Sequence, residues 1–234
     1  MSIYLKIAIV AACLLALIPL GLWAQSQDPH DRDWAKFSRY ESANAEVTTR
    51  PVAVLLGDSI TDNWAKWDGE WLQAHHYVGR GISAQVSSQM LVRFRADVLA
   101  LHPEYMILLA GTNDIARNNG FITVETVMGN LESMVELALL HAIKPVLCTV
   151  CPAARFGWYE AAGDPRPSIA KLNGLITAYA QARGIPLVDY HSALATPDGA
   201  LRPEYAKDSV HPNLEGYKVM EQVLQEVMDG LLAK

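Results

Sequence analysis

Short apolar runs alternate with longer amphipathic segments along most of the chain. A continuous apolar run is typical of a strand buried on both faces, and parallel strands need helical crossovers to connect them. The alternation therefore predicts an α/β fold, a three-layer α/β/α sandwich in which helices cover both faces of a parallel sheet. We expect strands at 52–56, 76–78, 105–110, 146–150 and 186–190 and helices at 33–45, 60–74, 83–99, 123–142, 168–183 and 212–232.

The composition suits one compact domain. With 234 residues, of which 51% are hydrophobic, the chain can bury a sizeable core but is short for two full domains. The formal net charge is -6, the pI is near 5.6, and no basic run offsets the acidic excess. These values argue against a surface for nucleic acid or anionic membranes. We expect a single domain over residues 25–234.

The N-terminus has the pattern of a targeting segment, because Lys6 precedes a mostly apolar run at 7–23. Residues 1–24 are either a signal peptide cleaved after Leu22-Trp23-Ala24 or an uncleaved membrane anchor. The run continues past Cys13, which disfavours a lipoprotein cleavage box at 10–13. Both favoured alternatives predict an extracytoplasmic protein, periplasmic or secreted, that touches a membrane only through an uncleaved segment.

The first predicted strand ends at Gly57-Asp58-Ser59, and a helix begins directly after it. Gly57 permits a tight exit, and the first N–H groups of the helix carry partial positive charge next to Ser59. Gly, Asp and Ser are also ordinary turn residues, and the G-x-S-x-G spacing of a nucleophile elbow is absent. Ser59 therefore needs partners from elsewhere in the chain before a catalytic role follows.

The expected winding supplies such partners. With strand order 2-1-3-4-5, the turns that contain Ser59, Gly81 and Asn113 converge at the switch point of the sheet. The first and last helices then share one face of the sheet, which brings Asp208-Ser209-Val210-His211 towards Ser59.

Each residue type has a chemical reason to be present. A serine nucleophile needs a base such as His211, and an acid such as Asp208 must orient that imidazole. The negative oxygen of a tetrahedral intermediate needs donors, for which the backbone N–H groups of Ser59 and Gly81 and the amide of Asn113 are candidates.

These four blocks, Gly57-Asp58-Ser59, Gly81, Gly111-Thr112-Asn113-Asp114 and Asp208-x-x-His211, resemble those of the SGNH hydrolases, also called GDSL esterases and lipases. The resemblance implies a flavodoxin-like fold, Ser59 as nucleophile, Asp208 and His211 as its partners, and Gly81 and Asn113 as oxyanion donors. It implies ester hydrolysis with no metal and no cofactor. The run from 79 to 83 looks most like the branch related to platelet-activating-factor acetylhydrolase, which favours short acyl groups.

Aromatic residues gather on the loop at 152–167, which follows the fourth expected strand. Phe156, Trp158 and Tyr159 could bind the alcohol portion of a substrate or pack among themselves. Ile60, beside Ser59, is a further candidate substrate contact.

Other motifs favour structural roles. Asp58 and Asp114 are expected to fix turns or caps. Cys148 and Cys151 are expected to be core cysteines and not a disulfide, because residues three apart in a strand point to opposite faces. Three tryptophans form a stripe at helical spacing, namely Trp64, Trp67 and Trp71. We expect this stripe to pack against the protein and not to stack on sugars.

We therefore expect a serine esterase that removes short acyl groups, foremost acetyl, from a small-molecule or carbohydrate ester. An acyltransferase acting on carbohydrate would use the same residues. A non-catalytic module of flavodoxin-like fold that binds flavin or carbohydrate is the alternative from another class, although it gives no reason for Asp208-x-x-His211.

Overall fold

The computed structural model describes residues 32–233. The predicted targeting segment, residues 1–24, and its cleavage alternatives lie outside the described residues. The chain divides into two units, Met1–Lys36 and Phe37–Lys234. In the described part of the first unit, the N–H of Lys36 donates to the carbonyl of Asp33 (3.0 Å). The sheet and the helices that cover it lie in the second unit.

A five-stranded sheet forms the centre of this unit, in the order β2-β1-β3-β4-β5. All neighbouring strands pair in parallel, so the predicted fold class and strand order are confirmed. The register aligns Gly57 with Gly81 on one side and with Leu109 on the other. The strands are β1 (Ala53–Gly57), β2 (Tyr77–Gly81), β3 (Tyr105–Leu109), β4 (Lys144–Cys148) and β5 (Leu187–Val188).

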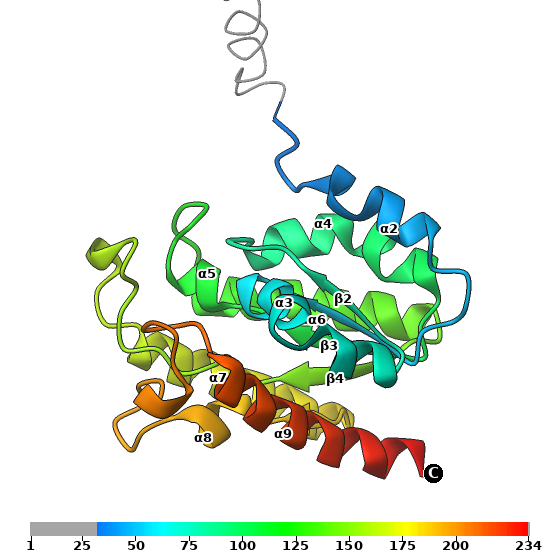
Figure 1. Cartoon of the computed structure of the whole chain (residues 1–234). Helices are drawn as coiled ribbons and strands as arrows, with labels where there is room; N and C mark the ends of the chain where they lie inside the picture. The colour runs from blue at the N-terminus through cyan, green and yellow to red at the C-terminus, as the bar shows by residue number, and fades with distance from the viewer. Residues whose placement is uncertain (1–31, 234) are drawn as a thin grey trace, which may run out of the picture. The chain divides into compact units, whose positions relative to one another are not determined.

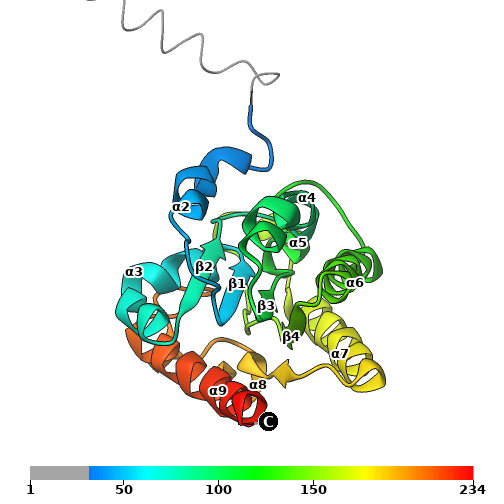
Figure 2. The same cartoon turned by 90° about the vertical axis from the view of Figure 1, so that its right-hand side faces the viewer.

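Helices cover both faces of the sheet, as Figures 1 and 2 show. Buried side chains of α4, α6 and α7 pack on one face, and those of α3, α8 and α9 pack on the other. The α-helices are α2 (Glu41–Ala45), α3 (Ser59–Ala74), α4 (Ser87–Asp97), α5 (Thr112–Ile115), α6 (Val124–Leu140), α7 (Arg166–Arg183), α8 (Tyr190–Leu194) and α9 (Leu214–Leu232). Short 3-10 turns are η2 (Phe37–Tyr40), η3 (Leu99–Leu101), η4 (Glu160–Ala162) and η5 (Pro203–Tyr205).

Burial on both faces explains why the sequence of β1 is apolar at every position. Val54 and Leu56 of β1 lie in the cluster under α4 and α6, whereas Ala53 and Leu55 lie in the cluster under α3 and α9. Successive side chains of a strand point to opposite faces, so a strand covered on both faces must be apolar throughout. The core is therefore two layers, one on each side of the sheet.

The tryptophan stripe of α3 packs in part as predicted. Trp64 is buried, its indole N–H donates to Glu221 Oε1 (3.1 Å), and its ring stacks on Trp71 with centroids 5.7 Å apart. Trp67 is 41% exposed, and the helix kinks at the next residue, Asp68, which has non-helical dihedrals. Trp64 and Trp71 thus join the core and Trp67 does not.

Cys148 and Cys151 are free and buried, which confirms them as core cysteines. Burial raises the pKa of both thiols, so neither is a ready thiolate. Across residues 32–233, no helix is both long enough and apolar enough to span a membrane.

Candidate active site

Ser59 lies where β1 ends and α3 begins, at the carboxyl edge of the sheet. A Cβ on Gly57 would come within 2.1 Å of Thr61 Oγ1 and 2.9 Å of the Leu109 carbonyl oxygen, so only glycine fits the exit. Asp58 caps the helix, since its Oδ1 accepts from the N–H of Ile60 (2.9 Å). As the first residue of the helix, Ser59 has no helical carbonyl for its own N–H.

Ser59, His211 and Asp208 form one hydrogen-bonded line. Ser59 Oγ lies 2.8 Å from His211 Nε2, and His211 Nδ1 lies 2.9 Å from Asp208 Oδ2. A carboxylate only accepts hydrogen bonds, so Nδ1 carries the imidazole proton in this pair. Nε2 of the neutral ring is then free to accept the proton of the serine hydroxyl. The sequence analysis predicted that these residues lie close together, and in the structure they are in direct contact.

The packing of α9 on α3 sets this geometry. The Tyr217 hydroxyl donates to the carbonyl of Ile60 (2.8 Å), and Glu221 accepts from Trp64. Both views show α9 beside α3 on the same side of the sheet (Figures 1 and 2). Asn213 caps α9 by accepting from the N–H of Gly216 (3.0 Å), which fixes the turn just after His211. The predicted sharing of one face by the first and last helices is therefore confirmed.

Asp208 is held in its charged form. Burial alone would raise the pKa of this carboxyl, but hydrogen bonds outweigh it and the pKa is lowered. The backbone N–H groups of His211 and Val210 each donate to Oδ1 at 2.8 Å, and the imidazole adds its own contact. At neutral pH the carboxylate is ionised and can stabilise a positive charge on His211.

A cavity of about 370 Å³ opens above Ser59, and we call it the site cavity. Five of its lining residues are predicted site residues, namely Ser59, Asn113, Trp158, Asp208 and His211. The sequence analysis missed the other five, which are Asn63, Ser83, Ala84, Asn118 and Lys207. In residues 32–233, no group of three or more His, Cys, Asp or Glu side chains is arranged to hold a metal ion.

Gly81 does not border the site cavity, contrary to the expected placement. It ends β2, where an added Cβ would lie 2.1 Å from the backbone nitrogen of Asp62. The glycine is thus required for the close approach of α3 to β2.

Ala84, three residues later, does border the site cavity and is exposed there. Its φ of 67° is left-handed, and its N–H has no acceptor among the described residues. The turn therefore leaves a backbone donor without a partner at a residue that borders the cavity, and no periodic pattern in the sequence marks that residue. Because glycine is the usual residue at such φ, the alanine at this position gave no sign of a left-handed turn.

Asn113 lines the site cavity from the start of α5. Its Nδ2 donates to Asp58 Oδ2 (3.2 Å) and to the carbonyl of Gln85 (3.0 Å), and its Oδ1 accepts from Asn118 Nδ2 (2.7 Å). Each end of the amide is therefore occupied, with the longest of these bonds running to Asp58.

Asp58 and Asp114 have the structural placements that were expected of them. Asp58 is 1% exposed and caps α3. Burial raises its pKa to about 6, and the nearby Asp114 adds to the rise. Asp114 accepts from both the N–H and the Oγ–H of Ser87, the latter at 2.6 Å, and so holds the start of α4.

Only one of the four candidate substrate contacts reaches the site cavity. Trp158 lines it, with its ring centroid 6.2 Å from that of His211. Phe156 is 1% exposed and packs in the core behind Trp158. Tyr159 is exposed but lies outside the cavity, and Ile60 is buried between α3 and the sheet. Phe156 thus takes the packing alternative that the sequence left open, and Ile60 also packs in the core. Neighbouring residues in a loop or helix face different directions, which is why these residues and Tyr159 do not line the cavity with Trp158.

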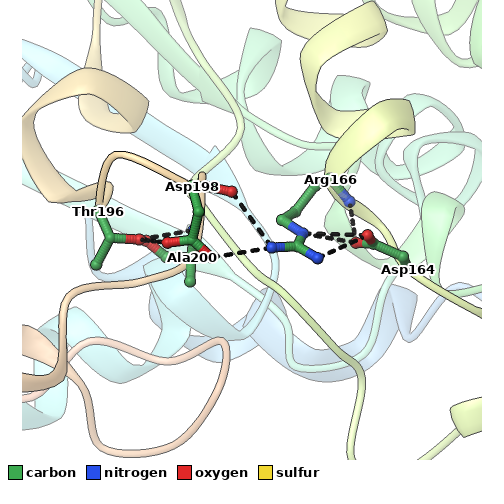
Figure 3. A network of polar contacts seen from close by, with 5 residues as sticks. All are labelled: Asp164, Arg166, Thr196, Asp198 and Ala200. Atoms are coloured by element: carbon green, nitrogen blue, oxygen red, sulfur yellow. Dashed lines mark hydrogen bonds and ion pairs between the residues drawn. The ribbon is translucent and has the colours of Figure 1, made fainter.

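Arg166 connects two loops of the carboxyl edge, as Figure 3 shows. Its guanidinium donates to Asp164, on the loop that carries Trp158, and to Asp198 Oδ2 (2.9 Å), on the segment that precedes Asp208. Thr196 Oγ1 donates to Asp198 Oδ1 (2.6 Å) and so braces the second loop. Both loops that contribute to the site cavity are thus tied to the start of α7.

Proteins of known structure share this arrangement of the chain. A predicted acylhydrolase from Bacteroides fragilis is 43% identical, with a TM-score of 0.83 over 86% of this chain and 99% of that one. A GDSL-like lipase from Bacteroides thetaiotaomicron is 39% identical, with a TM-score of 0.81 over 85% and 100% of the two chains. The uncharacterized lipoprotein YqeF of Bacillus subtilis is 27% identical, over 68% of this chain and 79% of that protein.

The family model confirms the resemblance that the motifs suggested. Residues 55–219, which include every block from Gly57 to His211, match the GDSL-like lipase/acylhydrolase family. The fold, the strand order and this match agree, and the chain belongs to the GDSL-like lipase/acylhydrolase family.

Proposed function

We propose that this hydrolase is a serine esterase that removes short acyl groups, foremost acetyl, from small-molecule or carbohydrate alcohols. The observation that carries the proposal is the unbroken line from Ser59 Oγ through His211 to Asp208 at the edge of a cavity. Such a line lets a neutral serine hydroxyl act as a nucleophile near neutral pH.

The proposed reaction begins when His211 Nε2 takes the Ser59 proton as Oγ bonds to the ester carbonyl carbon. The carbonyl oxygen becomes negative, and the N–H groups of Ser59 and Ala84 with the Asn113 amide donate to it. His211 then gives its proton to the departing alcohol oxygen, which leaves an acyl ester on Ser59. Water attacks that ester with His211 again as base, and the acid product leaves as Ser59 regains its proton.

The shape and lining of the site cavity support a short acyl group and a polar alcohol. At about 370 Å³ it is small for a ligand site, and most of its lining side chains are polar or charged. Trp158 supplies the single large apolar surface in that lining. A long acyl chain would need an apolar groove that this lining does not provide.

Hydrolysis is favoured over transfer of the acyl group to a carbohydrate. The Asp208 side chain is 49% exposed and that of His211 is 20% exposed, so water reaches the base directly. An acyltransferase must keep water from its acyl-enzyme. A non-catalytic flavin- or carbohydrate-binding module would have no use for a histidine bonded to both a serine and a carboxylate.

An extracytoplasmic location belongs to the same proposal. The targeting pattern of residues 1–24 supports it, as does a curated relative that is a lipoprotein. Esters in the periplasm or outside the cell would then be the substrates.

The decisive variant is Ser59→Ala, assayed on p-nitrophenyl esters from acetate to octanoate. We expect kcat/KM for the acetate ester to fall by about 10³-fold or more with an unchanged melting temperature. Ser83→Ala is the matched control, because Ser83 lines the same cavity and its hydroxyl donates to Asp62 and not to His211. Retained activity in Ser59→Ala would refute the proposal, and product analysis with a polyol acceptor would separate hydrolysis from transfer.

A further inference from the structure

A chain of hydrogen bonds runs from the loop after β4 to the Asn113 amide. The indole N–H of Trp158 donates to Asn118 Oδ1 (2.8 Å). Asn118 Nδ2 in turn donates to Asn113 Oδ1 (2.7 Å). The chain ends where Asn113 Nδ2 donates to Asp58 Oδ2, directly before the candidate nucleophile. Three segments far apart in the sequence therefore meet through side-chain amides.

Asn118 determines which end of the Asn113 amide faces which neighbour. An amide has a donor end and an acceptor end, and a donor from Asn118 can only meet the oxygen end. The NH2 end must then face Asp58 and the Gln85 carbonyl. The backbone adds to this control, since the N–H of Asn118 donates to the carbonyl of Asn113 (3.0 Å).

The position of Asn118 makes its bonding pattern informative. This side chain is exposed, where an amide would ordinarily bond to water, yet both its ends bond to protein side chains. It also lines the site cavity together with both of its partners. A loop residue held in this way restricts the rotation of its neighbour at the site and contributes little to the core.

Trp158 is fixed on two sides. Its N–H is held by Asn118, and its ring packs against the buried Phe156 with centroids 5.3 Å apart. The remaining surface leaves the side chain 48% exposed, next to His211. An alcohol group that packs against this ring would therefore contact the first residue of the hydrogen-bond series that orients Asn113.

We propose that Asn118 and Trp158 are positioning residues for the Asn113 amide, and that they act in series. Asn118 fixes the amide with its NH2 end towards Asp58, the residue before Ser59, and the Trp158 N–H fixes Asn118. When the negative oxygen forms, the Nδ2 hydrogen on the 3.2 Å bond to Asp58 is the one redirected to it. The inference rests on the proposed esterase function.

Three variants separate the links of the chain. Asn118→Asp keeps an acceptor for the Trp158 N–H but cannot donate to Asn113 Oδ1 or to the carbonyl of Ala84 (3.4 Å), whereas Asn118→Ala loses all three bonds. Trp158→Phe keeps an aromatic ring and loses only the N–H. Tyr159→Phe is the control, because Tyr159 neighbours Trp158 and lies outside the site cavity. Because Asn118 is exposed, we expect its variants to fold, and melting temperatures check this.

For p-nitrophenyl acetate we expect both Asn118 variants to lower kcat by about tenfold or more while KM changes by less than about threefold. Trp158→Phe should lower kcat by a smaller factor. Because the residues act in series, Asn118→Ala with Trp158→Phe should lose no more than Asn118→Ala alone. A trifluoromethyl ketone, which forms a negative oxygen when Ser59 adds to it, should lose affinity by the same factor as kcat.

A kcat within about twofold of the parent in Asn118→Ala would overturn the inference. The inference would also fail if the two losses in kcat multiplied in the double variant, or if the affinity for the ketone stayed unchanged. If Ser59→Ala is inactive in the same assays, the esterase function survives these failures. If Ser59→Ala retains activity, the esterase function itself fails.

Discussion

Asp58 adjoins the candidate nucleophile and carries the most unusual carboxyl of the site. Burial raises its pKa from an ordinary 3.8 to about 6. A carboxyl whose pKa is raised in the folded state binds its proton more tightly there than in the unfolded chain. Stability from this group is therefore complete below about pH 4 and is lost as pH rises through about 6.

Asp58→Asn removes this titration and keeps a side-chain oxygen that can cap α3. At about 1.4 kcal/mol for each pKa unit, the parent should lose about 3 kcal/mol relative to the variant between pH 4 and pH 7. Urea unfolding of both proteins across that range measures the difference. A difference in unfolding free energy that stays flat with pH would contradict the assignment.

Ala84 has a left-handed backbone that alanine disfavours. Ala84→Gly should relieve this conformation and raise the unfolding free energy by about 0.5–1 kcal/mol. Because glycine retains the backbone N–H, we expect esterase activity to stay within about threefold of the parent. Ala142→Gly is the matched control, since Ala142 has a φ of 58° and lies outside the site cavity. A large loss of activity in Ala84→Gly alone would show that the turn needs its methyl group.

At the scale of elements, one side chain of α4 ties the ends of two strands together. Arg93 is fully buried, and its Nη2 donates to the carbonyls of Gly57 (3.1 Å) and Arg80 (2.9 Å). Its Nη1 pairs with Asp97 at 2.8 Å. The carbonyls belong to the last residue of β1 and the next-to-last residue of β2, so the arginine holds the edge on which Ser59 and Ala84 stand.

Arg93→Met should destabilise the protein by about 3–5 kcal/mol, because buried Asp97 loses its charged partner and the carbonyls of Gly57 and Arg80 each lose a donor. Adding Asp97→Asn should restore part of that loss by removing the unpaired charge. Chemical denaturation of the single and double variants measures both effects. Arg166→Gln is the comparison, since its ion pairs in Figure 3 are exposed and should shift the unfolding midpoint little. Equal losses in Arg93→Met and Arg166→Gln would contradict the assigned role of Arg93.

At the scale of the whole unit, periodic patterns in the sequence predicted the strands and their order in the sheet. The apolar runs specified the strands, and the winding of a parallel sheet then placed His211 near Ser59. Parts without a period were missed, including α5 and α8. The helix expected at 83–99 begins only at Ser87, because the preceding residues form the turn that contains Ala84.

Site residues whose placement differs from the expected one share a physical cause. Whether Gly81 or Ala84 borders the site cavity depends on the backbone dihedrals of one turn. The residue types in this glycine-rich run do not reveal those dihedrals. The choice among Phe156, Trp158 and Tyr159 depends on which way a loop faces. Asn118 could be found only from its bonds, because an isolated asparagine after a short helix has no distinguishing spacing.

The fate of residues 1–24 can be tested on the exported protein. A signal peptide cleaved after Ala24 gives a chain that begins at Gln25 in the periplasmic or secreted fraction, whereas an uncleaved anchor gives the whole chain in the membrane fraction.

In either case Cys148 and Cys151 should remain reduced in an oxidising compartment, because burial raises the pKa of both thiols and keeps them from forming thiolates. Intact mass spectrometry after alkylation in denaturant measures the N-terminus and the thiols together. A whole chain recovered from the cytoplasm would contradict export, and thiols that react before denaturation would contradict their burial.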